Sequence, residues 1–116
     1  MKESLSDFNE FRSQMNDEIH ASDHLGMKRF FALDHKAYQD GALTRKTKEL
    51  LGLIGSAVLR CDDCITYHLV QCGEAGWKRE EVIDALDVAL IVGGSIVIPH
   101  LRRAFGHMGE IPGLQA

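Results

Sequence analysis

Residues that break or bend a polypeptide are scarce in this chain. Its 116 residues include two prolines and eleven glycines. The intervals between these residues have the length of helices, and no strand–turn–strand pattern appears between them. With 45% hydrophobic and 26% charged residues, the composition is that of one folded domain. We therefore expect a single all-α domain that spans residues 1–116.

The sequence also lacks an excess of basic residues and a long apolar run. Its formal charge is −4, with acidic and basic residues interspersed, which excludes the basic surface that binds nucleic acid or anionic membranes. The longest apolar stretch, residues 89–98, is interrupted by Gly93 and Gly94 and is too short to span a bilayer. Because residues 1–7 carry carboxylates and no apolar run, we expect no secretory signal and a cytoplasmic protein.

Apolar residues recur every three or four positions along most of the chain, a spacing that predicts about six helices. Ser4 or Ser6 can cap the first helix, and Thr44 can cap the third. Gly76 ends the fourth helix, and a pair of glycines separates the fifth from the last. The expected ranges are 5–20, 23 or 24 to 40, 45–58, the cysteine region up to 76, 79–92 and 95–108.

The predicted helices carry expectations about packing. The fifth is apolar around most of its circumference, so a small monomer would have difficulty burying it, and we expect a homo-oligomer. The alternative is a single compact bundle with this helix at its centre. Pro112 and Gly113 are expected to mark a loose tail. The second helix is expected to bury its apolar and aromatic residues, Phe30, Phe31, Leu33, Ala37 and Tyr38.

Only three cysteines occur, Cys61, Cys64 and Cys72, and they lie within a dozen residues of one another. A secreted, disulfide-stapled fold would spread an even number of cysteines between distant segments, so this cluster indicates a redox or metal site. On a helix, Cys64 and His68 lie one turn apart and can contact each other. Cys61 and Cys64 can form a disulfide if Cys61 lies at the helix start, where unpaired N–H groups favour a thiolate.

A zinc site is the alternative to redox chemistry. The segment supplies cysteine and histidine at C-x2-C-x3-H-x3-C spacing. Along a helix Cys61 and Cys72 would lie about 16 Å apart, so one metal ion cannot bind all four residues. A partial site made by Cys61, Cys64 and His68 with a ligand from another segment remains open. We predict no metal and no cofactor, and we interpret Cys72 as a small buried hydrophobic residue.

Glu49 lies twelve residues before Cys61, on the preceding predicted helix. The pattern Glu49-x11-Cys61-x2-Cys64-x3-His68 resembles the signature of the AhpD-like alkylhydroperoxidases, within the carboxymuconolactone decarboxylase superfamily. Residues 74–86 look like the next helix–turn–helix of that family, and the glycine pair at 93–94 looks like its glycine break. The resemblance spans residues 42–108.

The resemblance implies an AhpD-like helical bundle that assembles as a homo-trimer or homo-hexamer and reduces hydroperoxides with thiols. By position, Cys64 would attack the hydroperoxide, and Cys61 would be the resolving partner that closes the disulfide. His68 and Glu49 would form a proton relay that deprotonates Cys64, directly or through water. A dithiol reductant, either a protein or a small molecule, would then restore both thiols.

Other interpretations stay open on the sequence alone. Glu49 could be an exposed carboxylate paired with Lys46 or Lys48. The protein could be a lactone decarboxylase of the kind that names the superfamily, although that chemistry requires a cationic pocket and no thiol pair. It could also be a non-enzymatic, oligomeric redox sensor whose disulfide changes a partner surface.

The chain departs from the family pattern between its two cysteines. Some peroxidase relatives have a histidine there, where this chain has Asp62 and Asp63. This helper histidine is therefore absent, and the rate or the substrate is expected to differ. The two anions beside the thiols should also raise the pKa values of the thiols. Among the other histidines, His100 is expected to approach a site, because Pro99 fixes the chain beside it. The rest are expected at the surface or at subunit contacts, namely His20, His24, His35 and His107.

Overall fold

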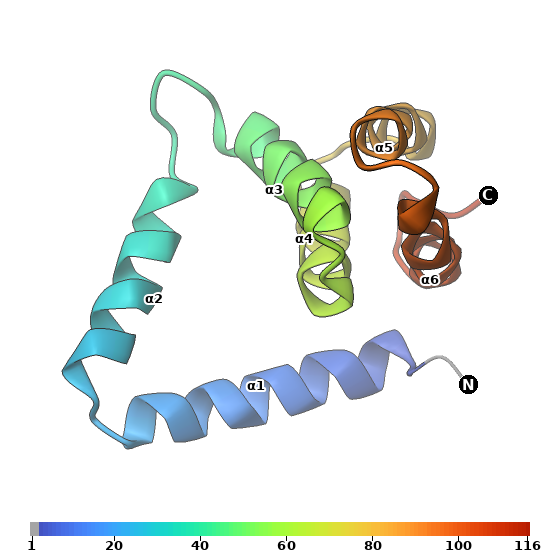
Figure 1. Cartoon of the computed structure of the whole chain (residues 1–116). Coiled ribbons are helices and arrows are strands. Elements are labelled where there is room, and N and C mark those ends of the chain that lie inside the picture. The colour runs from blue at the N-terminus through green and yellow to red at the C-terminus, as the bar shows by residue number, and fades with distance from the viewer. Residues whose placement is uncertain (1–2) are drawn as a thin grey trace.

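The structure, a computed structural model, describes residues 3–116 as six α-helices and one 3-10 turn, with no strand in this range (Figure 1). The helices are α1 (Leu5–Ala21), α2 (Leu25–Ala37), α3 (Arg45–Leu59), α4 (Asp62–Glu74), α5 (Arg79–Gly93) and α6 (Ile98–Met108). The 3-10 turn, Ser95–Val97, joins α5 to α6. The predicted all-α fold with about six helices is confirmed. None of the described helices is long and apolar enough to cross a membrane.

Capping residues set the helix boundaries near the predicted positions. Ser4 caps α1, because its Oγ accepts a hydrogen bond from the N–H of Asp7 at 3.1 Å. Beyond α4, Gly76 has a φ of +91°, and the N–H of Trp77 donates to a carbonyl in the last turn of α4. This is a Schellman turn, which ends the helix where the sequence predicted. Nε1 of Trp77 also donates to the carbonyl of Lys46 at 2.8 Å and so ties the turn to α3.

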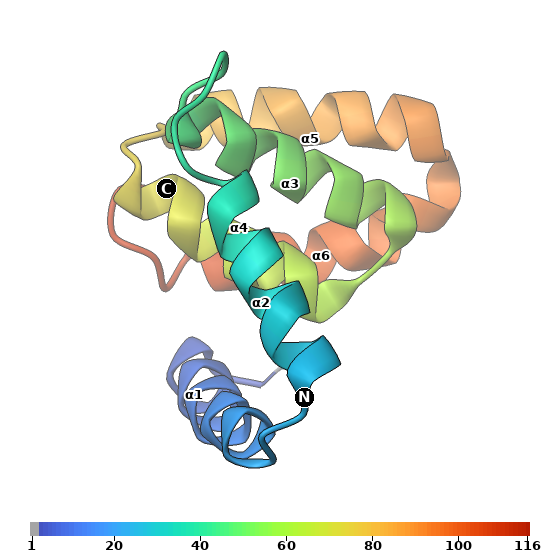
Figure 2. The ribbon, with the colours of Figure 1, turned by 90° about the vertical axis from the view of Figure 1, so that its left-hand side faces the viewer.

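The core lies between α3, α4, α5 and α6. α3 packs against both α4 and α5, and α6 packs against α4 (Figure 2). Each of these helices contributes a fully buried side chain, including Leu53, Leu69, Leu86 and Met108. Burying a side chain of this size stabilises a fold by about 1.5–3 kcal/mol. The packing therefore fixes α3 against α4, and this pair of helices carries the candidate site.

The C-terminal segment also packs onto the core. Ile111 and Leu114 are 3% and 0% exposed. The carbonyl of Leu114 accepts a hydrogen bond from Nη1 of Arg79 at 2.9 Å. The expectation of a loose tail at Pro112 and Gly113 is therefore wrong. Two apolar residues three positions apart are enough to anchor the segment, but they make too short a pattern to stand out in a sequence.

α1 and α2 form an arm outside the core (Figures 1 and 2). α2 buries no residue, and it ends at Ala37 instead of residue 40. Phe30 and Leu33 are 71% and 68% exposed, Ala37 is exposed, and Phe31 and Tyr38 are half-buried. The burial expected for α2 is therefore wrong within the single chain. Apolar spacing identifies one face of a helix, but it does not identify what covers that face.

α5 is buried on one face only. Val82, Leu86 and Ala89 lie in the core, whereas Ile91 and Val92 are 79% and 68% exposed. The alternative of a compact bundle with α5 at its centre is therefore wrong for this chain. A single copy leaves the outer apolar face of α5 in contact with water.

Candidate active site

The short connection between α3 and α4 places two cysteines at the start of α4. Arg60 follows α3 in the left-handed region, with a φ of +61°, and the chain turns directly into Cys61. Cys61 is the N-cap residue of α4, and its Sγ accepts a hydrogen bond from the N–H of Cys64 at 3.4 Å. Both cysteines are free, and their sulfur atoms lie 2.6 Å apart. The condition for a disulfide, with Cys61 at the helix start, is met.

One turn further along α4, His68 pairs with Glu49 of α3. Nδ1 of His68 lies 2.9 Å from Oε1 of Glu49, and the two side chains are 10% and 2% exposed. Arg45, one turn before Glu49, places its Nε 3.9 Å from Oε2 of the same carboxyl group. Because a carboxylate only accepts hydrogen bonds, Nδ1 is the donor. Glu49 is buried, so the alternative of an exposed carboxylate paired with Lys46 or Lys48 is wrong.

The other ring nitrogen of His68 faces Tyr38. The hydroxyl oxygen of Tyr38, directly after α2, lies 3.3 Å from Nε2 of His68. In the described part of the chain no hydrogen bond joins His68 to Cys64, although helical spacing places them one turn apart. Sequence analysis missed Tyr38 as a member of the site. Its ring fitted the apolar pattern of α2, and no motif marks it.

The surroundings of Cys64 favour the protonated thiol. Partial burial, the neighbouring Cys61 and the carboxylates of Asp63 and Asp34 raise the pKa of Cys64 to about 11. The effect of Asp63 has the direction expected from the sequence. At neutral pH Cys64 is therefore a thiol, and its use as a nucleophile requires a base.

Asp62, the other carboxylate between the two cysteines, is paired with residues of α6. Its Oδ1 lies 2.7 Å from Nδ1 of His100, and its Oδ2 lies 3.1 Å from Nη1 of Arg103. His100 therefore lies beside the first turn of α4.

His107, which was expected at the surface or at a subunit contact, is buried, and its Nδ1 lies 3.1 Å from Oε2 of Glu110. That expectation is wrong; because Glu110 satisfies the ring nitrogen, the burial leaves no unpaired polar atom there.

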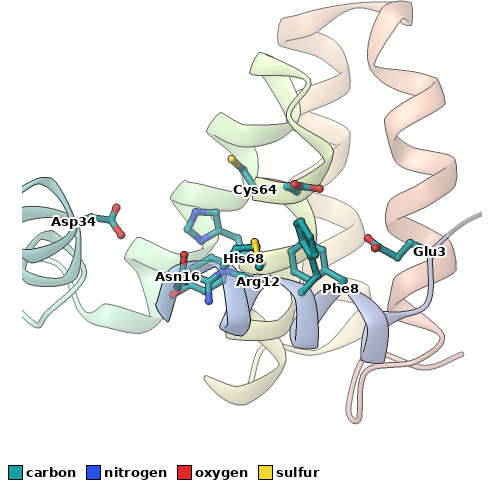
Figure 3. A pocket seen from close by; sticks show the side chains of 11 residues that line it. Glu3, Phe8, Arg12, Asn16, Asp34, Cys64 and His68 are labelled. Carbon is teal, nitrogen blue, oxygen red and sulfur yellow. The ribbon is translucent and has the colours of Figure 1, made fainter. Parts of the chain in front are cut away.

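A cavity of about 390 Å³ opens beside Cys64 and His68 (Figure 3). α1 supplies an apolar wall, made of Phe8, Phe11 and Met15. Cys64 is exposed, so its sulfur is accessible from this space. The cavity thus combines an accessible thiol with an apolar surface.

The charged residues around this cavity are mostly acidic. Arg12 lines it together with three carboxylates, those of Glu3, Asp34 and Asp63. The guanidinium of Arg12 lies over the ring of Tyr67, 4.1 Å from its centroid, in a cation–π contact. The cavity is therefore not a cationic pocket.

Cys72 lies apart from the thiol pair. It is fully buried in the core, and burial raises the pKa of its thiol to about 12. Its placement agrees with the packing role expected from the sequence.

Over residues 3–116, no group of three or more histidine, cysteine, aspartate or glutamate side chains is arranged to hold a metal ion. The structure therefore assembles no partial zinc site from Cys61, Cys64 and His68.

Comparison with known sequences identifies relatives of this chain. The model of the carboxymuconolactone decarboxylase family matches residues 25–106. Uncharacterized protein 4 of the cox locus of Paracoccus denitrificans is 30% identical over 84 residues, which cover 72% of this chain and 76% of the relative. An uncharacterized protein of Cupriavidus necator is 31% identical over 85 residues, which cover 73% of this chain and 75% of the relative.

Solved structures with the same fold carry the comparison further. The crystal structure of TM1620 from Thermotoga maritima is 56% identical, with a TM-score of 0.86 over 89% of this chain and 90% of that chain. A second crystal structure describes TM1620 as a carboxymuconolactone decarboxylase family protein with possible involvement in antioxidative response. It has a TM-score of 0.85 at 56% identity, over 89% of this chain and 87% of that chain. A family member from Legionella pneumophila, apo-lpg0406, has a TM-score of 0.83 at 25% identity over 91% and 95% of the two chains. Sequence match and fold thus agree with the AhpD-like signature, and the chain belongs to the carboxymuconolactone decarboxylase family.

Proposed function

We propose that this protein is a thiol-dependent peroxidase of the alkylhydroperoxidase type. One observation carries the proposal: two free thiols, Cys61 and Cys64, lie in contact at the start of α4, and Cys64 lines a cavity large enough for a small organic molecule. Cys64 is exposed, whereas Cys61 is half-buried. This difference favours Cys64 as the sulfur that meets the substrate and Cys61 as the resolving partner.

The reaction consumes one hydroperoxide and leaves a disulfide. The Cys64 thiolate attacks the O–O bond of the substrate; a sulfur–oxygen bond forms, the O–O bond breaks, and the alcohol leaves after taking up a proton. Cys64 is oxidised to a sulfenic acid. The Cys61 thiol then attacks the Cys64 sulfur, which forms the disulfide and releases water. A dithiol reductant, either a protein or a small molecule, reduces the disulfide and restores both thiols.

A base must accept the Cys64 proton before this attack. With a pKa of about 11, roughly one Cys64 in ten thousand is ionised at pH 7. His68 lines the same cavity as Cys64, and Glu49 is hydrogen-bonded to its far nitrogen. We assign this pair as the proton relay, in which His68 takes the proton and Glu49 stabilises the resulting imidazolium.

The lining of the cavity favours a neutral organic hydroperoxide as substrate. Phe8, Phe11 and Met15 offer apolar contact to an alkyl or aryl group. A carboxylated lactone would require a cationic pocket, but Arg12 shares this cavity with three carboxylates. The balance of charge therefore favours peroxide reduction over lactone decarboxylation. The antioxidative role suggested for the T. maritima relative supports the same choice.

We also propose that the chain functions as a homo-trimer or homo-hexamer in the cytoplasm. α2 and α5 expose large apolar side chains, and Phe30 and Ile91 are 71% and 79% exposed. A second copy of the chain would remove this surface from water. Free cysteines persist in a reducing compartment such as the cytoplasm. Light scattering of the purified protein should therefore give three or six subunits, and a monomer would contradict the assembly.

The peroxidase proposal is tested by turnover of cumene hydroperoxide with dithiothreitol. We expect Cys64→Ser to lose turnover. Without reductant, Cys61→Ser should accumulate a sulfenic acid at Cys64 that dimedone traps. Cys72→Ala is the matched control, because it removes the third thiol, which lies in the core, and it should retain turnover. In the unaltered protein, mass spectrometry should find a Cys61–Cys64 disulfide after peroxide treatment, with a mass loss of about 2 Da.

Three outcomes would contradict the proposal in different ways. Absence of both turnover and disulfide in the unaltered protein would refute the peroxidase function. A disulfide that forms without turnover would refute it as well and would support the redox sensor instead. A sulfenic acid that dimedone traps at Cys61 of Cys64→Ser, with none at Cys64 of Cys61→Ser, would reverse the roles of the two cysteines.

A further inference from the structure

Tyr38 is the hydrogen-bond partner of His68, within residues 3–116, that no motif accounts for. It lies in the connection directly after α2, outside the helix pair that carries the cysteines. Its hydroxyl oxygen is 3.3 Å from Nε2 of His68, and the centroids of the two rings lie 5.3 Å apart. A residue from the outer arm thus contacts the histidine of the candidate site.

Tyr38 and His68 meet beside a glycine of α3, Gly52. A Cβ atom built at Gly52 would lie 2.6 Å from the hydroxyl oxygen of Tyr38 and 2.8 Å from Nε2 of His68. Real Cβ atoms essentially never approach other atoms so closely. The absence of a side chain at this position is therefore what allows the tyrosine and the histidine to meet.

The connection that carries Tyr38 is itself held in place. Nζ of Lys48 donates to the carbonyl of Gln39 at 2.7 Å, and the N–H of Arg45 donates to Oδ1 of Asp40 at 2.7 Å. Both bonds tie the residues that follow Tyr38 to the first turns of α3. Tyr38 therefore approaches His68 from a fixed backbone.

Both ring nitrogens of His68 are engaged by this arrangement. Nδ1–H donates to Glu49, so Nε2 is the unprotonated nitrogen of the neutral ring and accepts a hydrogen bond from the hydroxyl of Tyr38. We propose that Tyr38 is a positioning residue that holds the ring of His68, whose tautomer Glu49 sets, with the basic Nε2 in place to accept a proton. This role rests on the proposed function, because it prepares His68 to accept the Cys64 proton.

The phenol can serve both states of the imidazole. When the Sγ–H bond of Cys64 breaks and the proton bonds to Nε2, the Tyr38 hydroxyl keeps its own proton and turns, so that its oxygen accepts a hydrogen bond from Nε2–H. Burial and the nearby carboxylates of Asp34 and Glu49 raise the pKa of Tyr38, so the phenol stays neutral throughout. Tyr38 therefore orients the base without becoming one.

Tyr67 provides a matched control, because its ring also contacts the ring of His68. Its ring lies 5.1 Å from that of His68, edge-on, at nearly the same distance as the ring of Tyr38. Its hydroxyl forms no hydrogen bond with His68 in the described part of the chain. Replacing each tyrosine by phenylalanine keeps both ring contacts, but only Tyr38→Phe removes the bond to Nε2.

The experiment compares Tyr38→Phe and Tyr67→Phe by three measurements on the full chain. Nitrogen-15 NMR of the His68 side chain reports its tautomer, the pH dependence of Cys64 alkylation by iodoacetamide reports removal of the thiol proton, and turnover of cumene hydroperoxide reports the reaction. We expect Tyr38→Phe to shift the Nε2 resonance, because this nitrogen loses its hydrogen bond, and to lower alkylation at pH 7 and turnover by about tenfold, part of the 10²–10⁴-fold that a positioned base contributes. Tyr67→Phe should leave the Nε2 resonance and the alkylation profile near those of the unaltered protein; these two measurements are the comparison, because Tyr67 itself lines the cavity.

The inference fails separately from the proposed function. It is overturned if His68 of the unaltered protein carries its proton on Nε2, if Tyr38→Phe leaves the Nε2 resonance and the alkylation profile unchanged, or if Tyr67→Phe changes both in the same way. If the unaltered protein shows no turnover at all, the peroxidase function fails. The tautomer and alkylation measurements still decide the role of Tyr38 in that case.

Discussion

Replacing Gly52 by alanine should destabilise the fold, whereas the same change at Gly55 should stabilise it. Both glycines lie inside α3, where alanine is favoured over glycine by about 1 kcal/mol. At position 55 nothing lies within 4 Å of the added Cβ. At position 52 the Cβ would lie within 2.8 Å of Tyr38 and His68 atoms. The two substitutions thus share their helix propensity and differ in the clash.

The clash decides the sign at position 52. The Tyr38 hydroxyl ends a flexible side chain and can move away, at the cost of its hydrogen bond, which contributes about 1 kcal/mol. His68 cannot move as easily, because it is buried and bonded to Glu49 at 2.9 Å. Adding a methyl group at such a packed position costs about 1–3 kcal/mol. After the gain in propensity, Gly52→Ala should lose about 1–3 kcal/mol, and Gly55→Ala should gain about 1 kcal/mol.

Urea denaturation of the two variants measures this difference in the free energy of unfolding. A gap of about 2–4 kcal/mol corresponds to about 8–16 °C in Tm for a domain of this size, at about 4 °C per kcal/mol. Adding Tyr38→Phe to Gly52→Ala removes the clashing hydroxyl and should recover part of the loss. If Gly52→Ala is as stable as Gly55→Ala, Tyr38 and His68 do not meet over Gly52, and the reasoning is refuted.

Two further predictions concern the core. The raised pKa of Cys72, about 12 in the folded chain against 9.0 for a free thiol, means that above pH 9 the unfolded chain releases this proton and the folded chain does not. The contribution of Cys72 to the free energy of unfolding is therefore complete below pH 9 and should fall by about 1 kcal/mol per pH unit between pH 9 and 12. Cys72→Ala should flatten this pH dependence. An unchanged slope would mean that another group causes it. Leu114→Ala should lower the free energy of unfolding by about 2–5 kcal/mol, because Leu114 is fully buried. The exposed Gln115→Ala should change it by less than about 0.5 kcal/mol, and equal effects would mean that the tail is not packed in solution.

The local features of the fold were predictable because they depend on residues close in the sequence. Ser4 and Thr44 cap their helices, and Gly76 ends α4, as the pattern indicates. Tertiary burial was not predictable in the same way. Phe30 and Leu33 have the spacing of a buried face, yet α2 stands away from the core, so they remain exposed. The spacing of one helix contains no information on its neighbour.

The candidate site shows the same division. The family signature placed Glu49, Cys61, Cys64 and His68 together, and the structure shows Glu49 bonded to His68 and the two sulfurs in contact. Tyr38 was not predicted, because its contact with His68 depends on the path of the α2–α3 connection and on Gly52 in α3. Neither feature has a sequence signature. A search of the sequence for functional side chains cannot find a contact that depends on the absence of a side chain.

The apolar wall of the cavity has a separate origin from the reacting groups. Cys64 and His68 come from α4, within the segment that the family model matches, whereas Phe8, Phe11 and Met15 come from α1, which precedes that segment. Under the proposed function, the reacting groups and the substrate contacts are thereby encoded in different parts of the chain. A change in α1 can alter which molecule fits while the thiols and their proton acceptor stay as they are. Under the proposed function, relatives that share the signature can therefore differ in substrate through a helix that lies outside the family model.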